Sequence, residues 1–150
     1  MVDIRVASTQ DQALVVELFS ELVDELGPAE LAERVKPLLA EDIRVAFATP
    51  LVRIFLAEDD GETIGLARAD VLTQDPIFRL RDDHRCGYVD QMYVRAAHRD
   101  RGVGSLLLAR CEAWFRSQGI GHALLHAAPK ATGFYSSAGY QPNREMFKRL

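Results

Sequence analysis

The stretch Arg99-Asp100-Arg101-Gly102-Val103-Gly104 places two arginines and two glycines immediately before a helix-like run. Gly102 and Gly104 lack Cβ atoms, so the backbone can turn sharply and a ligand can approach its amides. The following helix directs its unpaired N–H groups and the positive end of its dipole into the same turn. Because Arg99 and Arg101 add side-chain positive charge, the pattern predicts a pyrophosphate site and a diphosphate-bearing cofactor.

The residues that follow this loop exclude two common nucleotide motifs. A Walker A loop needs Lys and then Ser or Thr directly after its second glycine, but Ser105-Leu106 stand there. A dinucleotide fingerprint needs a third glycine at the position of Leu107. A plain nucleotide-binding domain is therefore disfavoured.

Three stretches, in this order, carry a resemblance to a known family. A strand-like run Tyr88-Val89-Asp90-Gln91-Met92-Tyr93-Val94 precedes the Arg-x-x-Gly-x-Gly loop, and Phe134-Tyr135-Ser136-Ser137-Ala138-Gly139-Tyr140 lies downstream. They resemble the fourth strand, the acyl-CoA pyrophosphate loop and the Phe-Tyr-x-x-x-Gly-(Phe/Tyr) signature of the GNAT superfamily of N-acyltransferases. Many relatives carry an Asn where this chain has Ala128, so any contact from that amide is absent.

The resemblance implies both a fold and a cosubstrate. The fold is α/β (α+β), with a mixed, mostly antiparallel central sheet flanked by helices on both faces, and the cosubstrate is acetyl-CoA. In the family the fourth strand is bulged and splays away from the next, leaving a wedge for the pantetheine arm beside backbone N–H groups. The expected cofactor contacts are Met92, Tyr93, Val94, Arg99, Arg101, Gly102, Val103, Gly104 and Ser105.

Acyl transfer to an amine requires a proton acceptor and a proton donor, because only the free amine attacks a thioester and the leaving thiolate must be protonated. The resemblance places the Tyr135 phenol beside the thioester sulfur as the acid; the alternative is a core aromatic. Asp90 holds the position from which an acidic residue in related enzymes takes the amine proton. The alternatives for Asp90 are an ion pair with a neighbouring Arg or attraction of a cationic amine. In a regular strand Gln91 would point to the opposite face.

Neither the histidines nor the cysteines suggest further chemistry. His126 lies near the end of an expected strand and could reach a cleft, although a structural role is favoured for it and for His122. No spacing of His, Cys and carboxylates is typical of a metal site, so we expect no metal. Cys86 and Cys111 are expected to be small buried residues in a reducing compartment.

Composition favours a single globular enzyme domain over residues 1–150. The chain has 150 residues, is 48% hydrophobic and has a formal net charge of -4. This acidic balance argues against nucleic acid as the main partner, because duplex binding normally needs a basic face. Without a signal peptide or an apolar stretch long enough to span a membrane, the protein is expected to be cytoplasmic and to have no membrane partner.

Periodicity predicts the element order βααβββαβαβ. A capping box, Thr-x-x-Gln, is expected at Thr9 to Gln12, and a hairpin turn at Asp59 to Glu62. The expected elements are a strand Ile4 to Ala7; a helix with the stripe Val15, Leu18, Phe19, Leu22, Val23 and Leu26; a helix Ala29 to about Ala40; strands Val52 to Glu58, Thr63 to Val71 and Tyr88 to Val94; a helix Ser105 to Gln118 buried through Val103, Leu107, Cys111 and Trp114; a buried strand Gly121 to Ala127; a helix Pro129 to Ala138; and a strand Tyr140 to Phe147. Leu72 to Arg85 is expected to be a loop.

The sequence thus predicts an N-acetyltransferase that moves an acetyl group from acetyl-CoA directly to a primary amine of a small molecule. One alternative acceptor is a protein or peptide amine. A catalytically silent acyl-CoA-binding domain is the other alternative. The retained Tyr135 argues against silence, and Ala128 argues mildly for it. The sequence leaves open both the identity of the amine and whether the chain forms a homodimer.

Overall fold

The computed structural model describes residues 1–73, 84–143 and 146–150, so most of the loop expected at Leu72 to Arg85 lies outside the described residues. The two ends of that expected loop belong instead to the flanking strands. The elements are β1 (Val2–Val6), η1 (Thr9–Asp11), α1 (Gln12–Leu26), α2 (Ala29–Ala48), β2 (Val52–Asp59), β3 (Glu62–Thr73), β4 (Arg85–Val94), η3 (Ala96–His98), α3 (Val103–Ser117), β5 (Ala123–Leu125), η4 (Pro129–Ala131) and α4 (Thr132–Ser137).

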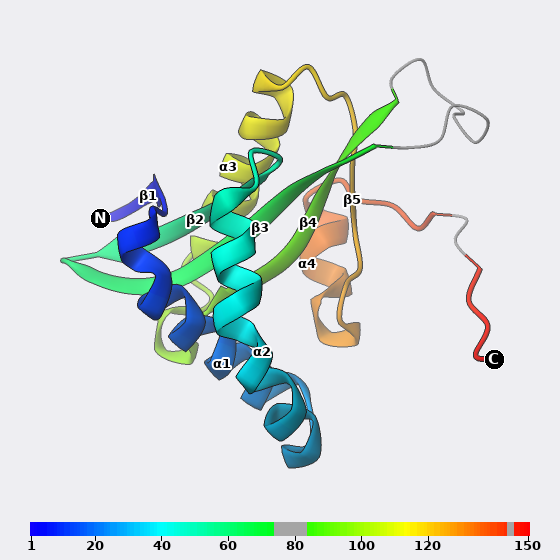
Figure 1. Cartoon of the computed structure of the whole chain (residues 1–150). Coiled ribbons are helices and arrows are strands. Elements are labelled where there is room, and N and C mark those ends of the chain that lie inside the picture. Colours follow the sequence, from blue (N-terminus) through cyan, green and yellow to red (C-terminus); the bar gives the residue numbers. More distant parts are fainter. Residues whose placement is uncertain (74–83, 144–145) are drawn as a thin grey trace.

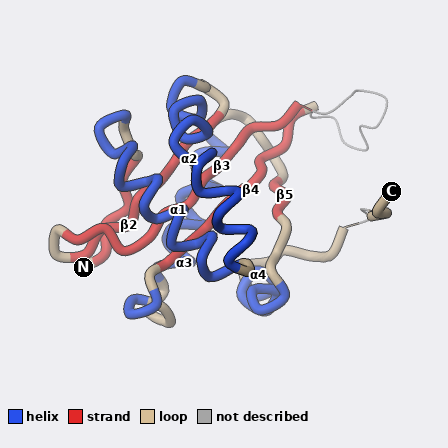
Figure 2. The backbone as a smooth tube through the Cα atoms, turned by 60° about the horizontal axis from the view of Figure 1, so that its bottom comes forward, coloured by secondary structure: helices blue, strands red, loops and turns tan. Residues whose placement is uncertain are grey.

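The five strands form one sheet in the order β1-β2-β3-β4-β5. The first three pairings are antiparallel, and β4 pairs with β5 in parallel. The helices α1 and α2 cover one face of this sheet and α3 covers the other (Figures 1 and 2). The expected mixed, mostly antiparallel sheet with helices on both faces is confirmed.

The β2–β3 hairpin is confirmed at its turn and in its pairing. Asp60 and Gly61 both have positive φ, 49° and 81°, between the paired residues Asp59 and Glu62. Two central residues with positive φ match the right-handed twist of the flanking strands, and Gly adopts this conformation without a Cβ penalty. This turn joins β2 to β3, and β4 pairs with the other edge of β3.

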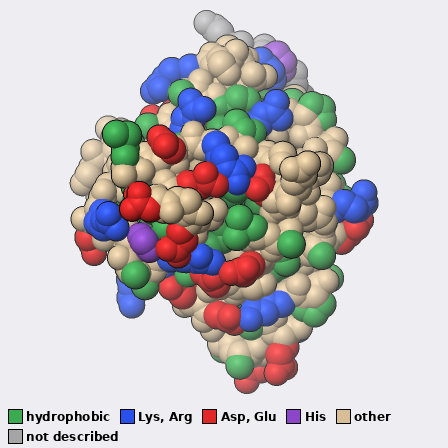
Figure 3. Space-filling view, turned by 90° about the vertical axis from the view of Figure 1, so that its left-hand side faces the viewer, with side chains coloured by type: hydrophobic (Ala, Val, Ile, Leu, Met, Phe, Trp, Pro, Cys, Tyr) green, Lys and Arg blue, Asp and Glu red, His purple; other side chains and the backbone are tan. Residues whose placement is uncertain are grey.

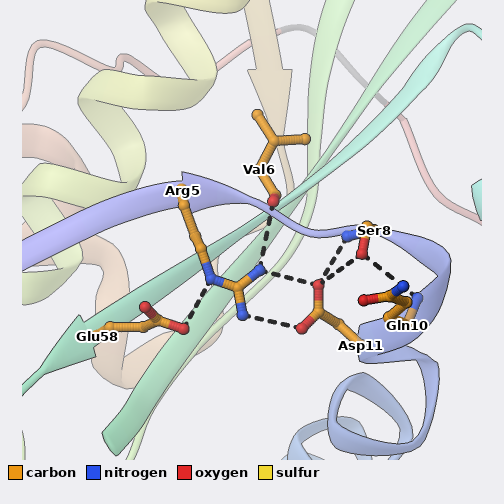
Figure 4. Close-up of polar contacts among 6 residues, drawn as sticks. All are labelled: Arg5, Val6, Ser8, Gln10, Asp11 and Glu58. Carbon is orange, nitrogen blue, oxygen red and sulfur yellow. Dashed lines mark hydrogen bonds and ion pairs between the residues drawn. The ribbon is translucent and has the colours of Figure 1, made fainter. Parts of the chain in front are cut away.

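The capping box at the entry to α1 lies one residue earlier than the expected Thr9 to Gln12. The Ser8 side chain accepts from the Gln10 N–H at 3.3 Å, and the Asp11 carboxylate accepts from the Ser8 N–H at 2.8 Å (Figure 4). Arg5 on β1 donates to both Asp11 oxygens at 2.8 and 2.9 Å and to Glu58 at 2.7 Å. This ion pair favours Asp11 over Gln12 as the reciprocal cap and joins the helix start to the sheet.

The second helix runs to Ala48 rather than to about Ala40, and it continues through Pro37. A proline inside a helix removes one backbone hydrogen bond, a cost that tertiary packing can offset. The buried face consists of Ala32, Leu39, Ile43 and Ala46. Leu38 lies outside this buried face and is 65% exposed.

Two hydrophobic cores hold the helices to the sheet. On one face, α1 and α2 pack on the sheet through Val15, Leu18, Phe19, Leu22 and Ile43, together with Ile54, Leu56, Leu66 and Tyr93 of the strands. On the other face, α3 contributes Val103, Leu107, Leu108, Cys111 and Phe115. The expected α1 stripe is buried except at its last two positions, where Val23 is half-buried and Leu26 is exposed. In α3 the deeply buried aromatic is Phe115, and its neighbour Trp114 is half-buried.

The C-terminal part departs most from the expected elements. The strand expected at Gly121 to Ala127 is short, Ala123–Leu125, and half-buried rather than buried, because it is the last strand in the sheet order. The described residues 140–143 and 146–147 form no strand. A strand requires a partner for its backbone groups, and among the described residues none pairs with this segment.

Charged side chains of both signs lie next to one another on the face seen in Figure 3. Ion pairs join α1 to the segment after β4, including Arg95 with Glu17 and Glu21, and Arg99 with Glu25. No helix among residues 1–73, 84–143 and 146–150 has the length and apolar character needed to cross a membrane.

Candidate active site

The site begins where β4 and β5 separate. Their pairing runs from Gly87–Ala123 to Val89–Leu125, whereas β4 continues to Val94. Beyond Val89, one edge of β4 therefore has no strand partner among the described residues. This separation is the wedge implied by the family resemblance.

The direction of the amides at the end of β4 follows from the ladder with β3. The Arg95 N–H donates to Ile64 O at 2.9 Å, which makes these two residues a hydrogen-bonded pair. Because such pairs alternate in an antiparallel ladder, Tyr93 also points its backbone groups toward β3. The backbone groups of Met92 and Val94 therefore face the wedge. Of the three residues expected to offer amides there, Tyr93 does not.

The glycine loop adopts the turn that its sequence predicts. Asp100 and Gly102 have positive φ, 59° and 80°, and Gly102 is the N-cap of α3. The helix begins two residues earlier than expected because Gly102 already accepts from the Leu106 N–H at 3.1 Å. No side chain caps this end, so the first-turn N–H groups are available to an anion.

A cavity of about 960 Å³ lies between this helix start and α4. Its lining includes most of the expected cofactor contacts together with residues of α1, η3 and the segment before α4. The expected residues that line it are Met92, Val94, Arg99, Gly102, Val103, Gly104, Ser105 and Tyr135. The expected residues outside the lining are Asp90, Tyr93 and Arg101.

The two loop arginines have different surroundings. The Arg99 guanidinium lines the cavity, donates to Val94 O at 2.7 Å and pairs with both Glu25 oxygens at 2.7 Å. Arg101 turns toward the hairpin and contacts Asp59 at 3.3 Å. Of the two loop arginines, only Arg99 therefore adds positive charge at the cavity, and Glu25 partly compensates that charge.

Tyr93 belongs to the core rather than to the cavity. Its side chain is 7% exposed and packs under α1. Burial and a hydrogen bond with Glu21 raise the pKa of its phenol. Its contribution to the site is to hold the end of β4 in place.

Tyr135 lies on α4 with its ring half-buried at the cavity. The ring packs edge-on against Phe134 and Tyr140, with centroids 5.0 and 6.0 Å away. Burial raises the pKa of the phenol, so it stays protonated at neutral pH. The hydroxyl forms no hydrogen bond with any residue in the described ranges, which leaves its proton available to a ligand.

Asp90 is the extra residue of a β-bulge, since Gln91 faces Arg68 and Val89 faces Ala69 across the ladder. The bulge makes the strand irregular, so Gln91 shares the face of its cross-strand partner Arg68 and does not point opposite to Asp90. The Asp90 carboxylate lies 3.3 Å from the Arg68 Nε. The expected bulge is confirmed, and it places Asp90 on the α1/α2 face.

The Arg68 guanidinium is shared by three carboxylates, of Asp90, Asp70 on β3 and Asp42 on α2, within 3.3 Å. Burial raises the pKa of Asp90, Arg68 lowers it, and the charges of Asp70 and Asp42 raise it again. The net direction is upward, toward the range in which a carboxylate accepts a proton more readily. Both alternatives for Asp90, an ion pair and a base, thus keep support.

His126 pairs with Tyr88, whose hydroxyl lies 2.6 Å from the His126 Nδ1. This contact was not foreseen, because the two residues are far apart in sequence and meet only when β5 lies beside β4. Cys86 and Cys111 are buried as expected, and burial raises the pKa of the Cys111 thiol to about 12. Residues 1–73, 84–143 and 146–150 contain no group of His, Cys, Asp and Glu able to hold a metal ion.

Several cavity residues were missed by the sequence analysis. Lys130 adds a positive charge and forms no ion pair with any residue in the described part of the chain, while Phe134 covers the first turn of α3. A Cβ on Gly104 would lie 3.3 Å from the Phe134 ring. Lys130 follows Pro129 in a segment without a motif, so only its position after β5 could have indicated it.

A family model described as "Acetyltransferase (GNAT) family" matches residues 15–140. The chain belongs to the GNAT family of acetyltransferases. The recognition from the three motifs is confirmed, and with it an acetyl-CoA-dependent N-acetyltransferase.

One relative is similar to this chain in sequence, and two solved structures are similar to it in fold. Glucosamine 6-phosphate N-acetyltransferase 1 of Oryza sativa subsp. japonica is 29% identical over 126 residues, which are 81% of this chain and 72% of the relative. A GCN5-related N-acetyltransferase from Ralstonia eutropha JMP134 has a TM-score of 0.89 at 24% identity and covers 100% of this chain and 99% of its own. A predicted acetyltransferase from Clostridium acetobutylicum, solved with acetyl-CoA, has a TM-score of 0.86 at 22% identity, with 100% and 96% covered.

Proposed function

We propose that this protein transfers the acetyl group of acetyl-CoA directly to a primary amine of a small molecule. The observation that carries the proposal is the wedge between β4 and β5, which has an anion-binding helix start and Tyr135 on one side of the sheet and Asp90 on the other. The rice relative, named for an amino-sugar phosphate, supports a small-molecule acceptor.

The donor fits the cavity in charge and in shape. The first-turn N–H groups at Gly102 to Ser105, with Arg99 and Lys130, would hold its pyrophosphate. Gly104 leaves the space that a side chain would fill, because Phe134 lies directly above it. The amides of Met92 and Val94 would hold the arm that ends in the thioester, and one of them would stabilise the oxyanion.

The acceptor would approach from the α1/α2 face. Asp90, Asp70 and Asp42 outnumber Arg68, so this region attracts a cationic amine. Asp90 would then accept the amine proton, as the alternative to a purely attracting role. The amine nitrogen forms a bond to the thioester carbon, the carbon–sulfur bond breaks, and the Tyr135 phenol protonates the leaving thiolate.

An acceptor panel tests this function. The purified chain would be incubated with acetyl-CoA and with amino-sugar phosphates, aminoglycosides, polyamines, amino acids or lysine peptides, while free thiol is measured. We expect thiol release above the acceptor-free rate with at least one small amine, and a stoichiometric acetylated product by mass spectrometry. Thiol release with peptides alone would contradict the small-molecule acceptor. If none of the acceptors increased thiol release, the result would favour the silent binding domain.

A further inference from the structure

Acetyl transfer to a cationic amine releases two protons from the nitrogen, and Asp90 can accept only one of them. A primary alkylamine is mostly an ammonium ion at neutral pH, because its pKa is near that of lysine, about 10.4. The ammonium must lose one proton to become a nucleophile and a second to become an amide nitrogen. A second proton acceptor on the acceptor side would therefore speed the transfer.

His126 lies at the start of the wedge between β4 and β5. The last β4–β5 pair is Val89 with Leu125, and the next residues along the two strands are Asp90 and His126. Val89 belongs to the core that contains α3, and Leu125 packs against the same core. Because successive side chains along a strand point to opposite faces, His126 faces the α1/α2 side, where Asp90 also lies.

The contact between His126 and Tyr88 agrees with this direction. Tyr88 pairs across the ladder with Asp70, which accepts hydrogen bonds from Arg68 at 2.9 and 3.0 Å, so the Tyr88 ring shares the face of these charged groups. The Tyr88 hydroxyl lies 2.6 Å from the His126 Nδ1, and the two rings meet edge-on with centroids 5.7 Å apart. Since the β5 partner of Tyr88 is Leu124, the Tyr88 ring leans two residues along β5, toward the wedge.

A phenol in contact with an imidazole can act as a proton relay. The phenol oxygen accepts a proton from a ligand while its own proton passes to the imidazole nitrogen, so the phenol stays neutral. Histidine is the side chain whose ordinary pKa, about 6.5, lies nearest to neutral pH, which favours proton transfer there. The His126 side chain is exposed, so its imidazolium could return the proton to water after each turnover.

We propose that Tyr88 and His126 together are the second proton acceptor of the acetyl transfer, a role that rests on the proposed function. One proton of the acceptor ammonium passes to the Tyr88 oxygen as the Tyr88 hydroxyl proton passes to the His126 Nδ1, and Asp90 takes the other. The nitrogen bonds to the thioester carbon, the carbon–sulfur bond breaks, and the Tyr135 proton goes to the thiolate. Two protons leave the nitrogen and one reaches the sulfur, so one proton is released to solvent.

Charged groups on the same face favour the approach of the ammonium to this pair. They include Asp90 on β4, Asp70 and Arg68 on β3, and Asp42 on α2, and the three carboxylates all lie within 3.3 Å of the guanidinium. Three negative charges and one positive charge leave this cluster negative. It would hold an ammonium ion beside both proton acceptors.

Steady-state kinetics with an amine that the wild type acetylates tests the pair. We expect kcat/KM at neutral pH to fall about 10²-fold in Tyr88→Phe and in His126→Ala, the low end of the usual contribution of a general base. The double variant should be no slower than either single variant, because the two groups act as one unit. All three variants should approach the wild type above about pH 10, where much of the amine is already free. His122→Ala, at the other end of β5, is the matched control and should keep the wild-type kcat/KM.

Added imidazole separates a proton acceptor from a structural contact. It should raise the kcat/KM of His126→Ala in proportion to its concentration and should leave Tyr88→Phe and His122→Ala unchanged; thermal melts verify that each variant is folded. A folded His126→Ala enzyme with the wild-type kcat/KM at neutral pH, or one that imidazole does not rescue, would overturn the role of the pair and leave the proposed function standing. A wild type that acetylates no amine would overturn both.

Discussion

At the level of single residues, Tyr135 is the proposed acid and Asp90 the proposed base of the acetyl transfer. Burial raises the pKa of the Tyr135 phenol, so the group is a donor rather than a base at neutral pH. Asp90 lies at a bulge and faces Arg68, so its charge is both partly desolvated and partly compensated. The two side chains belong to opposite faces of the sheet and can act together only across the wedge.

Replacing Tyr135 by Phe keeps the ring and its packing and removes the proton. We expect kcat to fall about 10²-fold, within the usual range for general acid catalysis, with little change in the dissociation constant of acetyl-CoA. Stopped-flow thiol release under conditions where chemistry limits the rate, with calorimetry for binding, measures both. Tyr140→Phe is the matched control, because the Tyr140 hydroxyl donates to Glu112. A folded Tyr135→Phe enzyme with more than about half of the wild-type kcat would exclude the acid role.

Asp90→Asn tests the base through the pH dependence of kcat/KM. The pKa of Asp90 is raised above its ordinary value of 3.8, so its activity as a base is lost as the pH falls through that raised value. In the wild type this loss produces a fall of kcat/KM on the acidic side of the pH profile, the acidic limb. The variant should lack this limb. Its kcat/KM should be low at neutral pH and should recover partly at high pH, where free amine is abundant.

Asp70→Asn is the control for that experiment, because Asp70 contacts the same Arg68 but is not the proposed base. Its profile should keep an acidic limb, shifted to lower pH, because the Asp70 charge contributes to the raised pKa of Asp90. If both variants change only KM, and by similar factors, Asp90 attracts the amine without accepting its proton.

At the level of elements, the helix start at Asp11 links β1 to α1 and can be tested by stability. Arg5 and the Ser8 N–H hold the pKa of Asp11 far below its usual value of 3.8. A lowered pKa contributes stability that is present above the unfolded pKa and is lost as the pH falls through the folded one.

Asp11→Asn should lower the free energy of unfolding at neutral pH by about 1 kcal/mol, the usual contribution of a helix cap. The difference from the wild type should shrink as the pH drops below about 4, since Asp11 of the unfolded wild type then takes up a proton while the folded carboxylate stays ionised. Urea unfolding followed by circular dichroism at several pH values measures this. A difference that stays constant down to acidic pH would contradict the ion-pair origin of the effect. Glu41→Gln, whose carboxylate pairs with Arg44 on the exposed side of α2, is the control and should change little.

The sequence predicted elements best where their signals were local. The Asp60-Gly61 turn and the Gly102 helix start depend on conformations that glycine favours, and both are present. Features that depend on distant partners were missed or misplaced. The Arg5–Asp11 ion pair favours a capping box one residue earlier than the expected one. The Tyr88–His126 contact forms only because β5 lies beside β4. The strand expected after Tyr140 has no partner strand within the described residues.

The site could be predicted to the same degree. The loop from Gly102 to Ser105 and Tyr135 line the cavity, and each could be found in the sequence because it belongs to a local motif. Arg101 and Tyr93 were misplaced because the direction of a side chain depends on partners, Asp59 and the α1 core, that no local pattern encodes. Lys130 was missed for the corresponding reason, because its segment carries no motif.

For the whole molecule, the sheet separates two tasks. In the proposed function, backbone N–H groups and cations on the α3/α4 side would bind the anionic donor, and carboxylates on the α1/α2 side would attract a cationic acceptor. A chain with a net charge of -4 can bind an anionic cofactor because these donors are local and directed. The account therefore depends on the cavity beside Gly104 being the place where acetyl-CoA binds.

Calorimetric titration of acetyl-CoA into the wild type and Gly104→Glu tests that claim most directly. The new side chain meets Phe134 and adds negative charge where the pyrophosphate would lie. We expect affinity to fall at least about tenfold, or about 1.4 kcal/mol. Gly133→Glu adds the same charge on α4 in open space outside the lining and should bind nearly as the wild type does. A folded Gly104→Glu protein that binds acetyl-CoA with unchanged affinity would contradict this placement of the cofactor.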